Sequence, residues 1–228
     1  MRTLIVMLPL LLAGLQPALA QDPAPATAPA PAPAAPAAAD YTLKASSSSL
    51  FVVVRKDPNT LASGLAHDHA VAATGWTGTV HWNPGNVAEC KIDITVPVSG
   101  LKVDPPGFRA KAGIDVEEVS DGDKGEIAAN FQGSSQLDMA KYSTITFQST
   151  SCAQSGDKVQ VSGNLTIRGK ARPTQVLMAV TADGTTLKAS GKFDANHTDW
   201  GFNPFSAAFG AVKNQNRLTF VMDLVASK

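Results

Sequence analysis

Residues 159–167 read VQVSGNLTI, and their apolar and polar side chains alternate. Val159, Val161, Leu165 and Ile167 therefore point to one side of an extended chain, and the polar residues point to the other. Such a segment is typical of an antiparallel strand that packs on a core with one face and meets water with the other. This stretch predicts a sheet protein, and other parts of the chain repeat its pattern.

The same alternation recurs at residues 90–96, 187–193 and 218–224. Turn-forming sequences separate the alternating runs, and Asp183-Gly184 between two of them is the strongest hairpin signal. Less regular segments complete the set. We predict strands at residues 41–46, 48–55, 69–82, 87–101, 143–153, 157–168, 173–183, 185–195 and 212–226.

One interval departs from this period and predicts a helix. Ser120 can cap a helix over residues 121–132, which places acidic side chains in the first turn and Ile127, Ala128 and Phe131 on one face. This helix would form a short crossover between two strands.

An all-β antiparallel meander with one helical crossover can form a sandwich or a closed β-barrel. Several predicted strands have about ten residues or more, against a usual ~5–6, and long strands with a single apolar face favour the barrel, because closure removes unpaired edges. The expected inward residues include the small side chains of Ala70, Ala72, Thr74, Gly78, Gly163, Ala189 and Gly191. Whether the interior is filled or hollow stays open at this point.

The first 40 residues predict export. Arg2 precedes the uncharged apolar stretch 4–15, and Ala18-Leu19-Ala20 ends it with small residues, so we expect a signal peptide at residues 1–20 that is cleaved after Ala20. Residues 21–40 hold six prolines and ten alanines, which predicts a disordered linker. The β domain then spans residues 41–228. We expect a periplasmic protein whose mature chain has no transmembrane segment.

Composition argues against several classes of function. The 19 basic and 19 acidic residues give no net charge, whereas nucleic-acid binding needs a basic excess. Two cysteines are too few for a disulfide-built mini-domain or a four-cysteine zinc site. The sequence contains neither a Gly-x-Ser-x-Gly elbow nor a glycine-rich phosphate loop. We therefore expect a protein without enzymatic activity.

Four motifs, in this order and spacing, resemble the YceI-like family. They are His67-Asp68-His69 at the start of a strand, LDMAKYSTITFQST at residues 137–150, VSGNLTIRGKARP at residues 161–173, and Asp199-Trp200-Gly201-Phe202. The resemblance covers about residues 41–226. Two positions depart from the family's pattern: Ser143 stands where a proline is usual, and His197 lies near a usual arginine.

The resemblance implies a lipocalin-like barrel that holds a polyisoprenoid or similar long amphipathic lipid, for carriage or storage, with no further cofactor. On that basis, the expected ligand-binding residues are His67, His69, Trp76, Ile92, Ile94, Phe131, Ile145, Phe147, Leu165, Ile167, Phe193, Trp200, Phe202, Phe209 and Phe220. The sequence leaves open the identity of the lipid and the oligomeric state, with a homodimer among the alternatives.

The pair His67 and His69 admits three interpretations. Residues i and i+2 of a strand point to the same side, so both imidazoles can reach one metal ion, but a site needs three or four ligands. His81 or His197 would have to complete it. The pair can also contact a phosphate or quinone head group, together with lysines and arginines at the barrel mouth, or simply form structural hydrogen bonds.

An aromatic loop contains Trp200, Phe202, Phe205 and Phe209 within ten residues. It can line or cover the entrance of a cavity, or it can plug the core.

Cys90 and Cys152 are candidates for a disulfide, since export places them in an oxidising compartment. Their positions in the alternation are out of phase: Cys90 shares a face with Ile92, but Cys152 does not share one with Ile145 and Phe147. A bulge near the strand end would correct the phase.

Overall fold

The computed structural model describes residues 37–115 and 119–228. The expected signal peptide, with its cleavage point after Ala20, lies outside these residues, as does nearly all of the expected linker. The first strand begins at Ala39, within the last residues assigned to the linker.

Most of the described chain is strand. In order, the strands are β1 (Ala39–Leu43), β2 (Ser49–Lys56), β3 (His69–Ala73), β4 (Thr77–Trp82), β5 (Lys91–Pro97), β6 (Leu101–Val103), β7 (Thr144–Ser155), β8 (Lys158–Ile167), β9 (Lys170–Ala182), β10 (Thr186–Asn196), β11 (Ser206–Ala207) and β12 (Val212–Ser227). The helices α1 (Phe108–Ala112) and α2 (Asp121–Gln132) lie between β6 and β7. Short 3-10 turns are η1 (Ala45–Ser47), η2 (Ser63–Leu65), η3 (Val87–Glu89), η4 (Val98–Gly100), η5 (His197–Trp200) and η6 (Ala208–Gly210).

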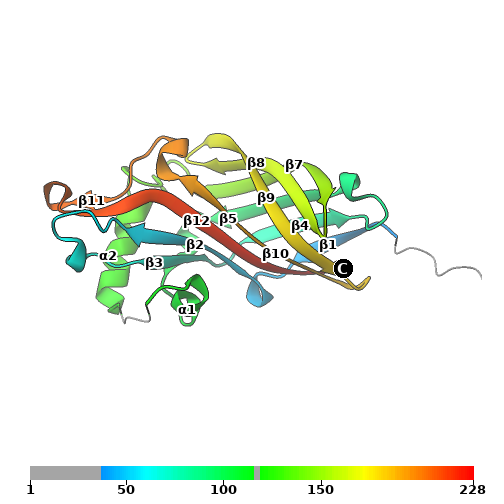
Figure 1. Cartoon of the computed structure of the whole chain (residues 1–228), viewed down its shortest axis with the longest axis horizontal. Coiled ribbons are helices and arrows are strands. Elements are labelled where there is room, and N and C mark those ends of the chain that lie inside the picture. The colour runs from blue at the N-terminus through cyan, green and yellow to red at the C-terminus, as the bar shows by residue number, and fades with distance from the viewer. Residues whose placement is uncertain (1–36, 116–118) are drawn as a thin grey trace, which may run out of the picture. The chain divides into compact units, whose positions relative to one another are not determined.

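Eight of the described strands form a closed ring in the order β1-β4-β5-β7-β8-β9-β10-β12, because β12 pairs back with β1. At one end of the ring, β2 pairs with β12, β3 with β2, and β6 with β3 (Figure 1). All pairings between these strands are antiparallel. The predicted all-β antiparallel barrel with a helical crossover is therefore confirmed.

Two of the expected strands are each divided in two. The expected strand 69–82 splits into β3 and β4 around Gly75, whose φ is +64°, and the expected strand 87–101 splits into β5 and β6 around η4. The two breaks lie against each other, since the Thr74 N–H donates to the carbonyl of Gly100 over 2.8 Å. A Cβ at Gly100 would lie 2.2 Å from the Thr74 oxygen, so the close approach requires glycine there.

The break around Gly75 changes which side chains face the interior. His69 and Val71 of β3 line the inside, and so do Val80 and Trp82 of β4, although the two pairs are out of phase along the chain. The expectation that Ala70 and Ala72 face inward is therefore wrong. The expectation treats residues 69–82 as one uninterrupted strand. The turn at Gly75 divides it and shifts the alternation by one residue.

The helix α1, which the sequence did not predict, covers the outer face of β2 and β3. Phe51 packs there with Ala70 and Ala72, and its ring meets that of Phe108 edge-on with centroids 5.4 Å apart. Val52, on the opposite face of β2, lines the interior. Both faces of β2 are thus covered, which accounts for its unbroken apolar sequence.

The barrel interior is filled in one half and hollow in the other. The filled half consists of Tyr41, Leu43, Trp76, Val80, Trp82, Cys90, Val96, Cys152, Val159, Val161, Val176, Met178, Leu187, Leu224 and Ala226. A smaller cluster in the other half consists of Leu165, Ile167, Trp200, Phe202, Leu218 and Phe220. The candidate functional site lies beside this second cluster.

The predicted helix α2 forms with the expected bounds. The Ser120 hydroxyl accepts the N–H of Asp123 over 3.1 Å and caps the first turn. Among the described strands, β6 pairs only with β3, and α2 packs beside it. The helix thus covers the part of the wall where β6 and β7 do not meet.

A disulfide joins Cys90 and Cys152, whose Cα atoms lie 5.9 Å apart. The β7–β8 ladder shifts register between Ser149 and Ser151. This bulge brings the Cys152 side chain into the filled half, which removes the conflict of phase seen in the sequence.

We predict that Leu224→Ala lowers the free energy of unfolding by about 2–5 kcal/mol, because Leu224 is buried in the filled half. The matched change Leu177→Ala, on a side chain that is 43% exposed, should cost less than about 1 kcal/mol. Urea denaturation measures both values. Equal losses in the two variants would contradict the assignment of a packed half.

Candidate ligand-binding cavity

A cavity of about 440 Å³ occupies the hollow half of the barrel, a volume within the usual ~300–1,000 Å³ of small-molecule sites. Its wall is largely apolar. The apolar lining residues are Val52, Val54, Leu65, Ala66, Val71, Leu101, Val119, Ile127, Phe131, Leu137, Ile145, Ile167, Phe202, Phe205, Val212, Leu218 and Phe220.

One side of the cavity is a stripe along α2. Asp123, Glu126, Ile127, Asn130 and Phe131 line it. These positions are three and four residues apart, a spacing that places side chains on the same face of a helix. The two carboxylates, Asp123 and Glu126, lie toward the N-terminal end of the stripe, and Ile127 and Phe131 lie toward its C-terminal end with the amide of Asn130 between them.

His69 is held in the cavity wall by a buried hydrogen-bond network. Its Nδ1 donates to Asp104 Oδ2 over 2.8 Å, and Arg109 donates to the same oxygen over 3.0 Å. The other oxygen, Oδ1, accepts the N–H of Ala70 over 2.7 Å. Burial alone would raise the pKa of Asp104, but the hydrogen bonds from His69 and Ala70 and the charge of Arg109 outweigh it and hold the pKa below its ordinary value.

This network fixes both the orientation and the tautomer of His69. A carboxylate only accepts hydrogen bonds, so Nδ1 carries the proton. When the ring is neutral, its Nε2 is therefore a hydrogen-bond acceptor.

His197 occupies a second polar position in the wall. Its Nδ1 donates to the carbonyl of Asn216 over 2.8 Å, and its ring meets that of Phe202 edge-on with centroids 5.4 Å apart. Burial lowers the pKa of His197 below the ordinary histidine value of 6.5, and the hydrogen bond to Asn216 opposes this only in part. At neutral pH the ring is uncharged, and its Nε2 can accept a hydrogen bond.

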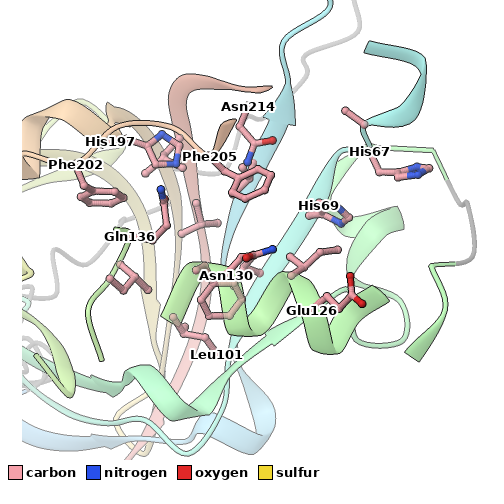
Figure 2. A pocket seen from close by; sticks show the side chains of 18 of the residues that line it. His67, His69, Leu101, Glu126, Asn130, Gln136, His197, Phe202, Phe205 and Asn214 are labelled. Atoms are coloured by element: carbon pink, nitrogen blue, oxygen red, sulfur yellow. The ribbon is translucent and has the colours of Figure 1, made fainter. Parts of the chain in front are cut away.

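The polar groups divide into two sets across the cavity. Figure 2 shows His67, His69 and Glu126 at one side and His197 with Gln136 at the other. Asn130 of α2 and Asn214 of β12 also line the cavity. Among the described residues, the lining includes carboxylates but neither lysine nor arginine. Arg109 lies beside His69 on the carboxylate of Asp104, but it is not part of the cavity lining.

The structure places part of the expected ligand-binding set on the cavity wall. These residues are His67, His69, Phe131, Ile145, Ile167, Phe202 and Phe220. Trp76, Ile92 and Ile94 belong to the filled half instead. Phe147 and Phe193 pack against both clusters, at the boundary between the halves.

The remaining expected residues lie elsewhere. Leu165 and Trp200 are buried in the second cluster, and Phe209 is fully exposed at the surface. The aromatic loop thus combines both of the proposed roles, because Trp200 fills the core while Phe202 and Phe205 line the cavity.

Several lining residues were not expected. The alternation of β2 does not show that Val52 and Val54 are internal, because β2 is apolar on both faces. Val71 lies on β3, where the turn at Gly75 shifts the phase of the alternation. Nothing in the local sequence around Gln136 and Asn214 indicates that they line a cavity, because only the closed barrel brings them there.

Among the described residues, no third ligand joins His67 and His69 in a metal site. Their ring centroids are 6.3 Å apart. Within residues 37–115 and 119–228, no group of three or more histidine, cysteine, aspartate or glutamate side chains is arranged to hold a metal ion. In the same residues, none of the helices combines the length and apolar character that crossing a bilayer requires.

The sequence profile of the YceI-like domain matches residues 41–224. The chain belongs to the YceI-like family. In this YceI-like domain, the turn Asp199-Trp200-Gly201-Phe202 anchors the cavity wall. The indole N–H of Trp200 donates to the carbonyl of Leu165 over 3.1 Å. Gly201 has a φ of +77°, which lets the chain reverse and direct Phe202 into the cavity.

Solved structures of two proteins share the YceI-like fold. The crystal structure of BcnA from Burkholderia cenocepacia aligns with a TM-score of 0.60 over 81% of this chain and 99% of that chain, at 18% identity. The YceI protein of Campylobacter jejuni aligns with a TM-score of 0.51 over 68% of this chain and 82% of its own, at 14% identity. The search of curated proteins found no match. At these identities the likeness concerns the fold alone.

We predict that His197 makes stability depend on pH just below neutrality. Its native pKa lies below 6.5, so as the pH falls through 6.5 the unfolded chain takes up a proton that the native state does not, and stability falls. The variant His197→Asn keeps a donor for the Asn216 carbonyl but does not titrate. Urea denaturation at about pH 7.5 and 5.5 should show a smaller loss for this variant than for the wild type. An equal loss in both proteins would show that His197 titrates normally.

Proposed function

We propose that this protein is a periplasmic lipid-binding protein that holds a polyisoprenoid or a similar long amphipathic lipid, without catalysis. The observation that carries the proposal is the apolar cavity in one half of a YceI-like barrel. The signal peptide expected at residues 1–20 supports the periplasmic location. Cell fractionation of the full-length chain tests this part, and recovery only in the cytoplasm would contradict it.

The cavity suits an apolar chain because burial there removes the chain from water. Each square ångström of apolar surface buried contributes about 25 cal/mol. The inner end of the cavity is bounded by Phe220, which lines it and stacks on Phe193 with centroids 4.7 Å apart. Phe193 in turn packs against the filled half. We therefore expect one section of a long chain to occupy the cavity.

The polar groups of the cavity favour an uncharged head group. His197 offers an uncharged acceptor, and Gln136, Asn130 and Asn214 are uncharged amides. A buried phosphate would find neither lysine nor arginine among the described lining residues, and the carboxylates of Asp123 and Glu126 would repel it. A quinone or a related hydrogen-bonding ring fits these groups better than a phosphate.

Native mass spectrometry of the protein purified from the periplasm, followed by addition of a prenyl quinone, tests the proposal. Ile127→Trp fills the cavity from α2 and should weaken uptake at least about tenfold. The matched control Ala129→Trp, on an exposed position of the same helix that does not line the cavity, should bind as the wild type does. A prenyl phosphate with the same chain should bind more weakly than the quinone.

Two results would contradict the proposal. Recovery of only empty protein, with no uptake of either lipid, would exclude lipid binding. Equal uptake by Ile127→Trp and the wild type would place the ligand outside the cavity. Tighter binding of the phosphate than of the quinone would overturn the assignment of the head group alone.

A further inference from the structure

Three large apolar side chains protrude into solvent at one end of the barrel. They are Leu61 and Leu65, which are 97% and 76% exposed, and Phe209, which is 113% exposed relative to its reference state. We call these three residues the apolar tip. The fourth large apolar residue with high exposure among the described residues, Leu177 on β9, is only 43% exposed.

The tip belongs to two loops that contact each other. Leu61 and Leu65 lie between β2 and β3, and Phe209 lies in η6 before β12. The Ala62 N–H donates to the carbonyl of Ala211 over 2.9 Å, which ties one loop to the other. Figure 1 shows both loops at the same end of the barrel, opposite the end where the C-terminus lies. The three side chains therefore form one local feature rather than scattered exposed residues.

The backbone holds Phe209 in an unusual conformation. Its φ is +55°, and that of the preceding Ala208 is +48°. Residues other than glycine seldom adopt this left-handed region, and such strain is concentrated at functional positions. Instead of folding its ring onto the barrel, the loop turns through two strained residues and leaves the ring in solvent.

Charge is absent from the tip and concentrated behind it. Residues 58–66 and 200–212 contain no lysine, arginine, histidine, aspartate or glutamate. The residues that flank these two segments carry charges of both signs: they include Lys56, Asp57, Asp68, Asp199 and Lys213. Protruding apolar side chains in an uncharged segment, with charged residues behind them, are typical of a surface that enters the interface of a bilayer.

The tip also continues into the cavity. Leu65 is part of both, and the neighbouring Ala66, Phe205 and Val212 line the cavity wall. An apolar path therefore leads from the exposed tip into the space assigned to the lipid.

We propose that the apolar tip inserts into the surface of a lipid bilayer and orients the cavity toward the membrane, so that a lipid can pass between them. This inference rests on the proposed lipid-binding function. A bilayer fits the tip better than a protein partner does, because three protruding side chains fall well short of the ~1,200–2,000 Å² that a stable protein interface buries.

Cosedimentation with vesicles of phosphatidylethanolamine and phosphatidylglycerol tests the proposal. The double variant Leu61→Ser/Phe209→Ser changes two exposed residues that do not line the cavity. It should bind vesicles at least about tenfold more weakly than the wild type. The control Leu177→Ser alters an exposed leucine on the barrel wall and should bind as the wild type does. Urea midpoints confirm that each variant is folded.

A second measurement separates this inference from the proposed function. Uptake of a prenyl quinone from detergent micelles, followed by native mass spectrometry, needs no bilayer and should be unchanged in the double variant. Absence of uptake by the wild type, with tip-dependent vesicle binding intact, would contradict the proposed function but not the membrane contact.

Equal vesicle binding by the wild type and the double variant would overturn the inference. So would sedimentation velocity showing a wild-type dimer that the double variant loses, together with no vesicle binding, because the tip would then be a contact between two copies of the chain.

Discussion

β12 closes the barrel, and the rest of the structure depends on that closure. One edge of this strand pairs with β10 from Thr186 to Asn196, and the other edge pairs with β2 and then with β1. Because both edges are occupied along most of the strand, β12 leaves no open edge in the ring and the sheet encloses an interior. The alternation of β12 therefore places Leu218, Phe220 and Leu224 inside the barrel.

The two halves of that interior differ because different side chains reach them. Trp76 and Trp82, with Tyr41 of β1, fill one half with large rings. The other half receives smaller side chains from β2 and β3, such as Val52 and Val71, and is covered on one side by α2 instead of a strand. The cavity, its polar side chains and the apolar tip beside it all lie in this second half. The asymmetry leaves space for a ligand in one half of a barrel whose other half is packed.

The sequence predicts the parts of this fold that local alternation controls. β8, β10 and β12 each have one apolar face, and their positions are close to those expected. β2 and β3 were harder to interpret. β2 is buried on both faces, and the turn at Gly75 shifts the phase of the alternation that follows it. α1 is too short to produce a helical period, so its role in covering β2 and β3 is evident only in the folded chain.

In the candidate site, too, the sequence predicts what is local and misses what depends on segments far apart in the chain. His67 and His69 are two residues apart on an extended chain, so their shared side follows from geometry. His197, Gln136 and Asn214 come from three separate segments, and nothing in their local sequence indicates that they meet. Whether a barrel is hollow depends on the sum of side-chain volumes across facing strands, which requires the register of every strand.

The central claim is that a lipid chain occupies one half of the barrel and is excluded from the other. Intermolecular nuclear Overhauser effects between a bound prenyl quinone and the methyl groups of the protein test this most directly. We predict such contacts for Val52, Val54, Leu101 and Leu218, which line the cavity, and none for Leu43, Leu187 and Leu224 in the filled half. Contacts in both halves, or none at the cavity residues, would contradict the account.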